Sequence, residues 1–408
     1  MKILFVNEKC GYFGGVEQNI ADTVKGLNSR GHDCFLAYGE ISARDLEQYK
    51  SLFEKTFRCQ EIAATQELAA QALEEILDQI SPDVIYFHKV PELKSFMHLL
   101  PKNRTVRMVH DHDLCCPRRH KYFVTNGQVC HHKLDWRCWF DGAFIARDPA
   151  SRSGFAFVSI GSKLREMRRN YHLDALLVGS RFMRDELLQN SFPEEKVHLM
   201  PPVIRMAHIV RGQTPSPVPD DPRILYVGQL IRGKGVDLLL QALKGLTCDF
   251  RATVVGTGNA ESKLKALCTE LGLDNRVEFS GWVRNEDLGH FYSKAKVVVV
   301  PSRWPEPFGM IGLEAMHHGR PVVAFDVGGI PDWLDHMETG ILVPEQDVKA
   351  LGNALQKILG ENRPGRRSHF GGVGLAEKLG QNGLRRVRDH YAFEGYLDRL
   401  EGCLKGDQ

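Results

Sequence analysis

The sequence predicts an α/β protein with two doubly wound parallel sheets, in two domains of similar size that face each other across a cleft. Short apolar runs alternate with helical patterns along the chain, which is typical of repeated βα units around a parallel sheet. At 408 residues the chain also exceeds what one hydrophobic core usually holds. A proline-rich segment, residues 212–222, interrupts the alternation about halfway, because neither a helix nor a central strand persists there.

The expected strands are short and apolar. In the first half they lie at residues 3–7, 34–38, 84–87, 105–109 and 175–179, and in the second half at residues 224–227, 251–255, 277–279, 296–300 and 321–325. We therefore place an N-terminal domain at residues 1–208, a linker at residues 209–222 and a C-terminal domain at residues 223–387. Residues 362–374, rich in glycine and arginine, are expected to form a mobile loop.

Composition excludes some classes of function. Charged residues make up 25% of the chain and hydrophobic residues 43%, as in ordinary globular proteins. A net charge of +2 gives no case for nucleic acid as a partner. Residues 101–170, however, hold 14 Lys and Arg against 6 Asp and Glu. This segment is a candidate to face an anionic membrane or a phosphorylated acceptor, with a solvated basic helix as the alternative.

Targeting signals are not evident in the sequence. No stretch reaches the roughly 18 to 20 apolar residues that a membrane span needs. The apolar opening, residues 1–7, is too short for a signal peptide and predicts a buried strand. Ten cysteines without an export signal are expected to be reduced thiols. We therefore expect a cytoplasmic protein, peripheral at most at the inner face of the membrane.

Two carboxylates bracket a short apolar segment in the second half. Glu306 and Glu314 stand on either side of seven mostly apolar residues, directly after the apolar run at residues 296–300. The pattern predicts a switch from strand to helix, where free N–H groups and the positive end of the helix dipole attract an anion. It therefore indicates a ligand site. The alternative is that both glutamates are ordinary capping and first-turn residues.

Further motifs surround this pair in a specific order. They are YVGQLIRGKG at residues 226–235, VVGTG at 254–258, FSGWV at 279–283, RPVVA at 320–324 and VGGIP at 327–331. Together with the two glutamates they resemble the nucleotide-sugar-binding half of retaining glycosyltransferases of the GT-B fold, glycosyltransferase family four (glycosyl transferases group 1). The resemblance implies two Rossmann-like domains. It also implies a C-terminal crossover helix, at about residues 388–408, that packs back on the first domain.

The resemblance assigns roles around the donor phosphates. Arg232 and Lys234 lie in a glycine-rich turn after a strand, where cations and N–H groups converge on a pyrophosphate. Lys234 matches the family lysine. Gln229 stands where the family usually has arginine, and Arg232 is expected to supply that charge instead. A surface turn with two solvated bases is the alternative.

The remaining donor contacts follow from the same match. Glu306 is expected to hold the donor sugar, Glu314 to accept hydrogen bonds from the ribose, and the backbone of Val283 to contact the base. Backbone N–H groups next to Glu306 are expected to bind the sugar and its phosphate; they belong to Phe308, Gly309, Met310 and Ile311.

The first domain offers candidates on the acceptor side. Gly14 and Gly15 join the first strand to a helix and resemble the family's Gly-Gly-x-Glu turn, which lets the backbone approach a ligand. His110 ends a strand at the carboxyl edge and matches a family histidine near the anomeric carbon. A plain turn and a structural histidine are the alternatives. His88, which ends the preceding strand, is a weaker candidate.

A cysteine-rich segment follows His110. Four of the ten cysteines lie within residues 115–138, with three histidines between them. A structural zinc ion at Cys116, Cys130 and Cys138 is an alternative that we do not favour, because the spacing is not of the paired Cys-x-x-Cys kind. A loop with free thiols that shapes the acceptor site is preferred.

The resemblance implies a retaining, metal-independent hexosyltransferase of polysaccharide or glycoconjugate biosynthesis. Its donor would be a nucleotide-diphosphate sugar and its acceptor a glycan, a lipid-linked sugar or a small molecule. No cofactor is expected for catalysis. Two alternatives remain: a nucleotide-sugar epimerase of the same architecture, and a catalytically weak homologue that binds a partner protein.

Overall fold

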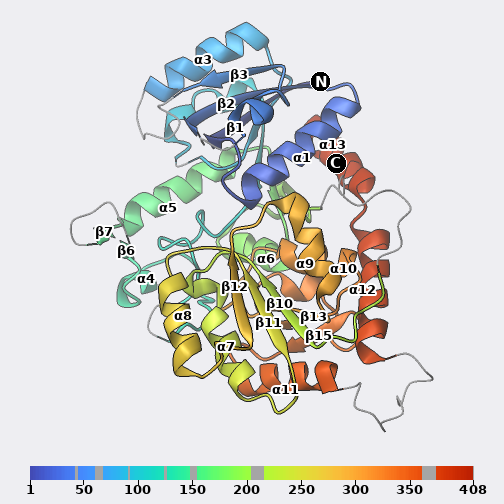
Figure 1. Cartoon of the computed structure of the whole chain (residues 1–408). Helices are drawn as coiled ribbons and strands as arrows, with labels where there is room; N and C mark the ends of the chain where they lie inside the picture. The colour runs from blue at the N-terminus through green and yellow to red at the C-terminus, as the bar shows by residue number, and fades with distance from the viewer. Residues whose placement is uncertain are drawn as a thin grey trace. The chain divides into compact units, whose positions relative to one another are not determined.

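The computed structural model describes residues 1–41, 45–59, 68–90, 92–123, 126–147, 154–203, 216–360 and 374–407. The chain forms two compact units (Figure 1). Unit 1 consists of Met1–His120, His131–Arg205 and Phe393–Gln408, and unit 2 of Lys121–Cys130 and Met206–Ala392. Within the described ranges, no helix is both long and apolar enough to cross a membrane.

Unit 1 is built on a parallel sheet in the order β3-β2-β1-β4-β5-β8-β9. The strands are β1 (Lys2–Cys10), β2 (Asp33–Ile41), β3 (Lys55–Arg58), β4 (Val84–Phe87), β5 (Arg104–Val109), β8 (Ala175–Val178) and β9 (Val197–Leu199). A separate antiparallel hairpin joins β6 (Ile145–Arg147) to β7 (Phe155–Phe157). The helices are α1 (Gly15–Ser29), α2 (Leu46–Lys50), α3 (Leu68–Ile80), α4 (Arg137–Phe140), α5 (Ile160–Arg169), α6 (Arg181–Gln189) and α13 (Phe393–Lys405).

Unit 2 is built on a second parallel sheet in the order β12-β11-β10-β13-β14-β15. The strands are β10 (Arg223–Val227), β11 (Arg251–Val255), β12 (Val277–Gly281), β13 (Val297–Val300), β14 (Val322–Phe325) and β15 (Gly340–Val343). The helices are α7 (Val236–Lys244), α8 (Glu261–Glu270), α9 (Leu288–Lys294), α10 (Met310–His317), α11 (Val348–Leu359) and α12 (Leu375–His390).

Burial and capping explain these elements. All four valines of β13 are buried, as expected for a central strand covered on both faces. Several helices begin at a side-chain cap: Ser159 and Ser180 accept hydrogen bonds from the third residue after them, and Asp347 does the same for α11. Such caps satisfy backbone donors that the helix leaves unpaired.

The prediction of a doubly wound α/β fold is confirmed, and the inner strands lie where the sequence placed them. The errors are at the sheet edges, because β3, β9 and β15 were not predicted. Strand β3 carries two basic residues and a threonine, and β9 has only three residues with a histidine in the middle, so neither gives a clear apolar run.

The C-terminal helix belongs to unit 1, although unit 2 precedes it directly. It begins at Phe393, later than the predicted residue 388, because residues up to His390 continue α12. It packs on α1, where a Cβ atom added to Gly26 would lie 2.7 Å from Leu397. The hydroxyl groups of Thr23 and Tyr396 are 3.1 Å apart in the same contact.

Two expectations from the sequence fall largely outside the described residues. The first half of the predicted linker, residues 209–215, and nearly all of the predicted mobile loop, residues 362–373, lie outside them.

Candidate functional site

The strand order of unit 2 reverses between β10 and β13. From β10 the chain moves outward to β11 and β12, then returns to the other side of β10 with β13. In open parallel sheets, ligands bind outside the carboxyl ends of the strands at such a reversal. The loops that follow β10 and β13 carry Lys234 and Glu306, two residues that the sequence motifs had singled out.

Lys234 and Glu306 form an ion pair at this point. The Lys234 Nζ atom lies 2.7 Å from Oε1 and 3.0 Å from Oε2 of Glu306. The hydroxyl group of Ser302 donates to the same carboxylate at 2.5 Å. Glu306 is buried, whereas 26% of the Lys234 side chain is exposed. The carboxylate is therefore fixed by two donors, and the ammonium group remains within reach of a ligand from solvent.

The two loops are held together by their backbones. The N–H groups of Arg303 and Trp304 both donate to the carbonyl of Gly233 at 2.9 Å. Gly235 has a φ of 68°, and a Cβ atom there would lie 1.8 Å from the carbonyl oxygen of Pro301. Only glycine fits this position without moving the second loop. Arg303 also pairs with Asp237 of α7 at 2.5 Å, which fixes the start of that helix.

Helix α10 begins directly beside the ion pair. Gly309 precedes it with a φ of 94°, a left-handed conformation that favours glycine. The indole N–H of the buried Trp333 donates to the carbonyl of Phe308 at 2.6 Å. The first turn of the helix starts with Met310 and Ile311, whose N–H groups have no partner within an α-helix at that position. The turn is thus positioned to bind an anion.

Glu314 lies one turn further along α10. Its carboxylate accepts a hydrogen bond from the hydroxyl group of Tyr292 at 2.8 Å. Burial raises the pKa of Glu314 to about 7, although the hydrogen bond from Tyr292 opposes the shift. The carboxyl group is therefore balanced between its neutral and ionised forms near neutral pH, and a ligand that donates hydrogen bonds would favour ionisation.

The remaining predicted residues of unit 2 surround this centre less closely. Gln229 and Arg232 have exposed side chains, and their carbonyls accept hydrogen bonds from Tyr226 at 2.9 Å and from Arg303 at 2.9 Å. Arg232 makes no ion pair with any described carboxylate. Val283 follows β12 and is half-buried. Their predicted roles in donor binding stay predictions.

Unit 1 shows a similar reversal between β1 and β4. Gly14 directly precedes α1 and Gly15 is the first residue of that helix, and both are exposed. Gly14 has a φ of −173°, which any residue adopts, and a Cβ atom on Gly15 would meet nothing within 4 Å. The space at this helix start is therefore open, and backbone strain is not what requires glycine there.

His110 follows β5 and is paired with a second histidine. Its Nε2 atom lies 2.8 Å from Nδ1 of His88, which follows β4, and the two rings are stacked. Burial lowers the pKa of His110 to about 3 and holds that of His88 well below its usual value. Both imidazoles are thus neutral at physiological pH. Next to them, Lys89 and Asp111 form an ion pair at 2.5 Å.

Three residues of the site were missed by sequence reasoning. Ser302 and Tyr292 donate to the two glutamates, and Trp333 supports the start of α10. Ser302 lies four residues before Glu306, right after the strand, so its position held a weak signal. Tyr292 and Trp333 reach the site from other elements, and local sequence carries no sign of that.

Family models match both halves of the chain. The family model of Glycosyltransferase Family 4 matches residues 13–208, and that of Glycosyl transferases group 1 matches residues 213–383. An uncharacterized glycosyltransferase of Methanocaldococcus jannaschii is 35% identical over 188 residues, which cover 46% of this chain and 45% of the relative. The alpha-D-kanosaminyltransferase of Streptomyces kanamyceticus is 28% identical over 242 residues, which cover 54% of this chain and 58% of the relative. The matches thus span about half the length of these relatives.

Solved structures show the same architecture. The Anabaena protein Alr3699/HepE, in complex with UDP and with UDP-glucose, has a TM-score of 0.72 to this chain at 18% and 19% identity, and the alignments cover 100% of both chains. The fold is therefore that of the GT-B glycosyltransferases. Because the two family models together match nearly the whole chain, it belongs to the glycosyl transferases group 1, with a first half of the family 4 type.

Proposed function

We propose that this protein is a retaining, metal-independent glycosyltransferase that moves a hexose unit from a nucleotide-diphosphate sugar to an acceptor. The observation that carries the proposal is the ion pair of Lys234 and Glu306 at the strand reversal of unit 2, next to the first turn of α10. A cation and a helix N-terminus attract a diphosphate, and a fixed carboxylate accepts hydrogen bonds from sugar hydroxyls. The UDP and UDP-glucose complexes of HepE make uridine nucleotides the first donors to test.

In this mechanism Lys234 stabilises the leaving group. The bond from the anomeric carbon to the diphosphate oxygen breaks, and negative charge develops on the diphosphate, where the ammonium group and the N–H groups of α10 meet it. The acceptor oxygen forms the new bond on the same face, and its proton passes to the diphosphate. Lys234 exchanges part of its contact with Glu306 for the phosphate, which leaves that carboxylate available to the sugar.

His110 is proposed to act in its neutral form. With a pKa of about 3, it is not an imidazolium at physiological pH, so it is a poor general acid and does not repel the positive charge of an oxocarbenium-like centre. Its contact with His88 fixes the ring. We assign it to positioning the acceptor or the donor sugar.

Thermal unfolding with a panel of nucleotide diphosphates and their sugars tests the donor. A ligand that binds the folded state raises the melting temperature by mass action. We expect a selective shift with one nucleotide, lost in Lys234→Ala. If none of the panel shifts the melting temperature, the transferase proposal is wrong. If free nucleotide and an altered sugar are released without any acceptor, the epimerase alternative holds instead.

An exposed aromatic patch on unit 1 supports a lipid-linked acceptor. The patch consists of Trp136, Trp139, Phe140, Phe144 and Phe157, on and beside α4 and β7. Phe140 is 83% and Phe157 86% exposed, and the aromatic rings of the patch contact one another in pairs. Exposed aromatic clusters of this kind mark interaction sites, and Trp favours the membrane interface.

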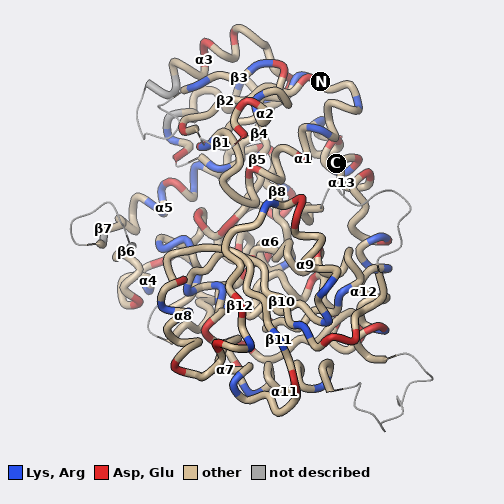
Figure 2. The backbone as a smooth tube through the Cα atoms, in the orientation of Figure 1, with Lys and Arg blue, Asp and Glu red and all other residues tan. Residues whose placement is uncertain are grey.

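Basic residues lie in the same part of the chain. Helix α5 ends with Arg168 and Arg169, and Arg165 and Arg168 are exposed. Figure 2 shows basic positions along this helix in blue. We propose that unit 1 touches an anionic membrane surface through the patch and these arginines. Flotation with vesicles of phosphatidylcholine, with and without phosphatidylglycerol, measures binding to the membrane surface. We expect vesicle binding to need the anionic lipid. It should weaken in Phe140→Ala but not in the control variant Trp282→Ala of unit 2. Equal binding by both variants would contradict the proposal.

A further inference from the structure

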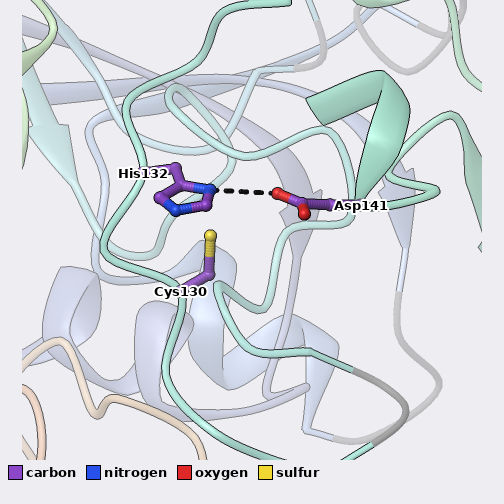
Figure 3. Close-up of side chains that lie close together, drawn as sticks. All are labelled: Cys130, His132 and Asp141. Carbon is purple, nitrogen blue, oxygen red and sulfur yellow. Dashed lines mark hydrogen bonds and ion pairs between the residues drawn. The ribbon is translucent and has the colours of Figure 1, made fainter. Parts of the chain in front are cut away.

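Three side chains with zinc-ligand chemistry meet in the cysteine-rich segment. Cys130, His132 and Asp141 each offer one ligand atom, and these atoms all lie within 4.8 Å of one another (Figure 3). A thiolate, an imidazole and a carboxylate are the three donor types that bind zinc in proteins. All three belong to one stretch of twelve residues, so the grouping depends on local chain geometry.

The backbone around the three residues is well anchored. The N–H group of Cys130 donates to the carbonyl of Lys121 at 2.8 Å, next to a bridge between Tyr122 and Val129. At the other end, Asp141 caps α4, and its carbonyl accepts a hydrogen bond from Arg118 at 3.2 Å. Anchored ligands lose little entropy when they bind an ion, which favours a site formed before the metal arrives.

The geometry requires only a small adjustment to hold an ion. Nδ1 of His132 lies 3.0 Å from Oδ2 of Asp141, and the sulfur of Cys130 points toward this pair (Figure 3). Zinc bonds of about 2.0 to 2.3 Å place tetrahedral ligands roughly 3.3 to 3.8 Å apart, so movements of about 1 Å are enough. Cys130 is buried, whereas His132 and Asp141 are partly exposed. Solvent can therefore deliver the ion and supply a fourth ligand.

We propose that Cys130, His132 and Asp141 bind a zinc ion, with water in the fourth position. On binding, the Cys130 thiol releases its proton and the thiolate forms the bond to zinc. This ligand set differs from the three cysteines considered from the sequence: the structure groups Cys130 with a histidine and an aspartate, and the sulfur of Cys138 contacts the carbonyl of Lys133 at 3.9 Å.

The ion would have a structural role. It would tie Cys130 to the end of α4, the helix that carries Trp139 and Phe140 of the aromatic patch. Because the site needs no donor sugar, the proposal stands or fails independently of the transferase activity.

The test is metal binding by the purified full chain. Elemental analysis after purification and after dialysis against a chelator measures zinc per chain, and re-addition of zinc should restore one ion and raise the melting temperature. Cobalt, used as a spectroscopic probe, should show a thiolate-to-metal charge-transfer band and the visible bands of a tetrahedral ion.

Variants identify the ligands. Cys130→Ser, His132→Ala and Asp141→Ala should each weaken zinc binding at least 10-fold, whereas Cys116→Ser and Cys138→Ser should bind as the unchanged protein does. Asp141→Cys should keep the ion and strengthen the cobalt charge-transfer band, which a misfolded variant would not do. The proposal is overturned if the chain binds no zinc, or if Cys138→Ser loses the ion while His132→Ala keeps it.

Discussion

The two sheets share one strand plan but place different chemistry at the point where the strand order reverses. In unit 2 this point carries an ion pair, Lys234 with Glu306, whose lysine is partly exposed. In unit 1 the corresponding edge carries two neutral histidines, the buried His88 and the partly buried His110. A charged pair suits a charged leaving group, and neutral imidazoles suit a sugar or a hydroxyl group. The same backbone plan thus supports two kinds of recognition.

The helix starts differ in the same way. Gly309 before α10 has a left-handed φ of 94°, whereas Gly14 before α1 is extended at −173°. Gly309 needs to be glycine because of this backbone conformation. Gly14 is surrounded by open space, so the two positions respond differently to substitution even though both precede a helix at the edge of a sheet.

The largest expected effect comes from removing the cation of unit 2. Lys234→Ala should lower kcat/KM about 100- to 1000-fold, because the developing charge on the diphosphate loses its nearest cation. Steady-state kinetics with the identified donor measures it. Lys265→Ala is the control, since that lysine forms an exposed ion pair with Glu261 within α8. Equal activity of the two variants would show that Lys234 is an ordinary surface base.

Removing the neutral imidazole of unit 1 should have a smaller effect. His110→Gln is expected to lower kcat about 10- to 100-fold and to leave donor binding unchanged, because the donor phosphates are proposed to bind in unit 2. Since His110 is neutral above about pH 3, the acid limb of the pH profile should not move. A loss of nucleotide binding, measured by calorimetry, would contradict this division of roles, with His172→Gln as the control.

The glycine comparison predicts a difference in stability. Gly309→Ala should lower the free energy of unfolding by about 1 to 2 kcal/mol, because a side chain at positive φ is strained. Gly14→Ala should change it by less than about 0.5 kcal/mol. Denaturant titration of both variants measures the difference. Similar values would mean that the two helix starts are equivalent after all.

The smallest expected effect is a pH dependence of donor affinity. Glu314 has a pKa of about 7 in the folded protein against an ordinary value of 4.5. It should therefore gain charge, and accept hydrogen bonds better, as the pH rises through 7. Donor affinity is expected to increase up to about tenfold between about pH 6 and 8. Glu314→Gln controls for titration of the nucleotide itself, and an identical pH dependence in that variant would exclude the carboxylate.

The raised pKa of Glu314 also makes the stability of the fold depend on pH. Between about pH 4.5 and 7 the folded state binds more protons at Glu314 than the unfolded state does. The contribution of this group to stability is therefore present at low pH and is lost as the pH rises through 7. Compared with Glu314→Gln, the unchanged protein should lose stability over this range.

Most of the fold could be predicted because inner strands are buried on both faces. The run at β13 is apolar at every position, and its burial follows directly. The edge strand β15 contacts one neighbour only and carries a weaker pattern. For the site, spacing along the chain indicated Lys234 and Glu306. The hydrogen bond from Tyr292 to Glu314 joins two different helices, and no local pattern could indicate it.

The path of the chain through its two units affects the order in which the units can fold during synthesis. Helix α13 completes unit 1 but follows the last residue of unit 2. On the ribosome the whole of unit 2 is available to fold while α1 still lacks the partner that covers Gly26 and Thr23. Unit 1 therefore waits, with an apolar helix face uncovered, until unit 2 and then α13 have emerged. A stalled or shortened chain would leave that face open to proteases and chaperones, so loss of α13 should reduce the amount of protein in the cell.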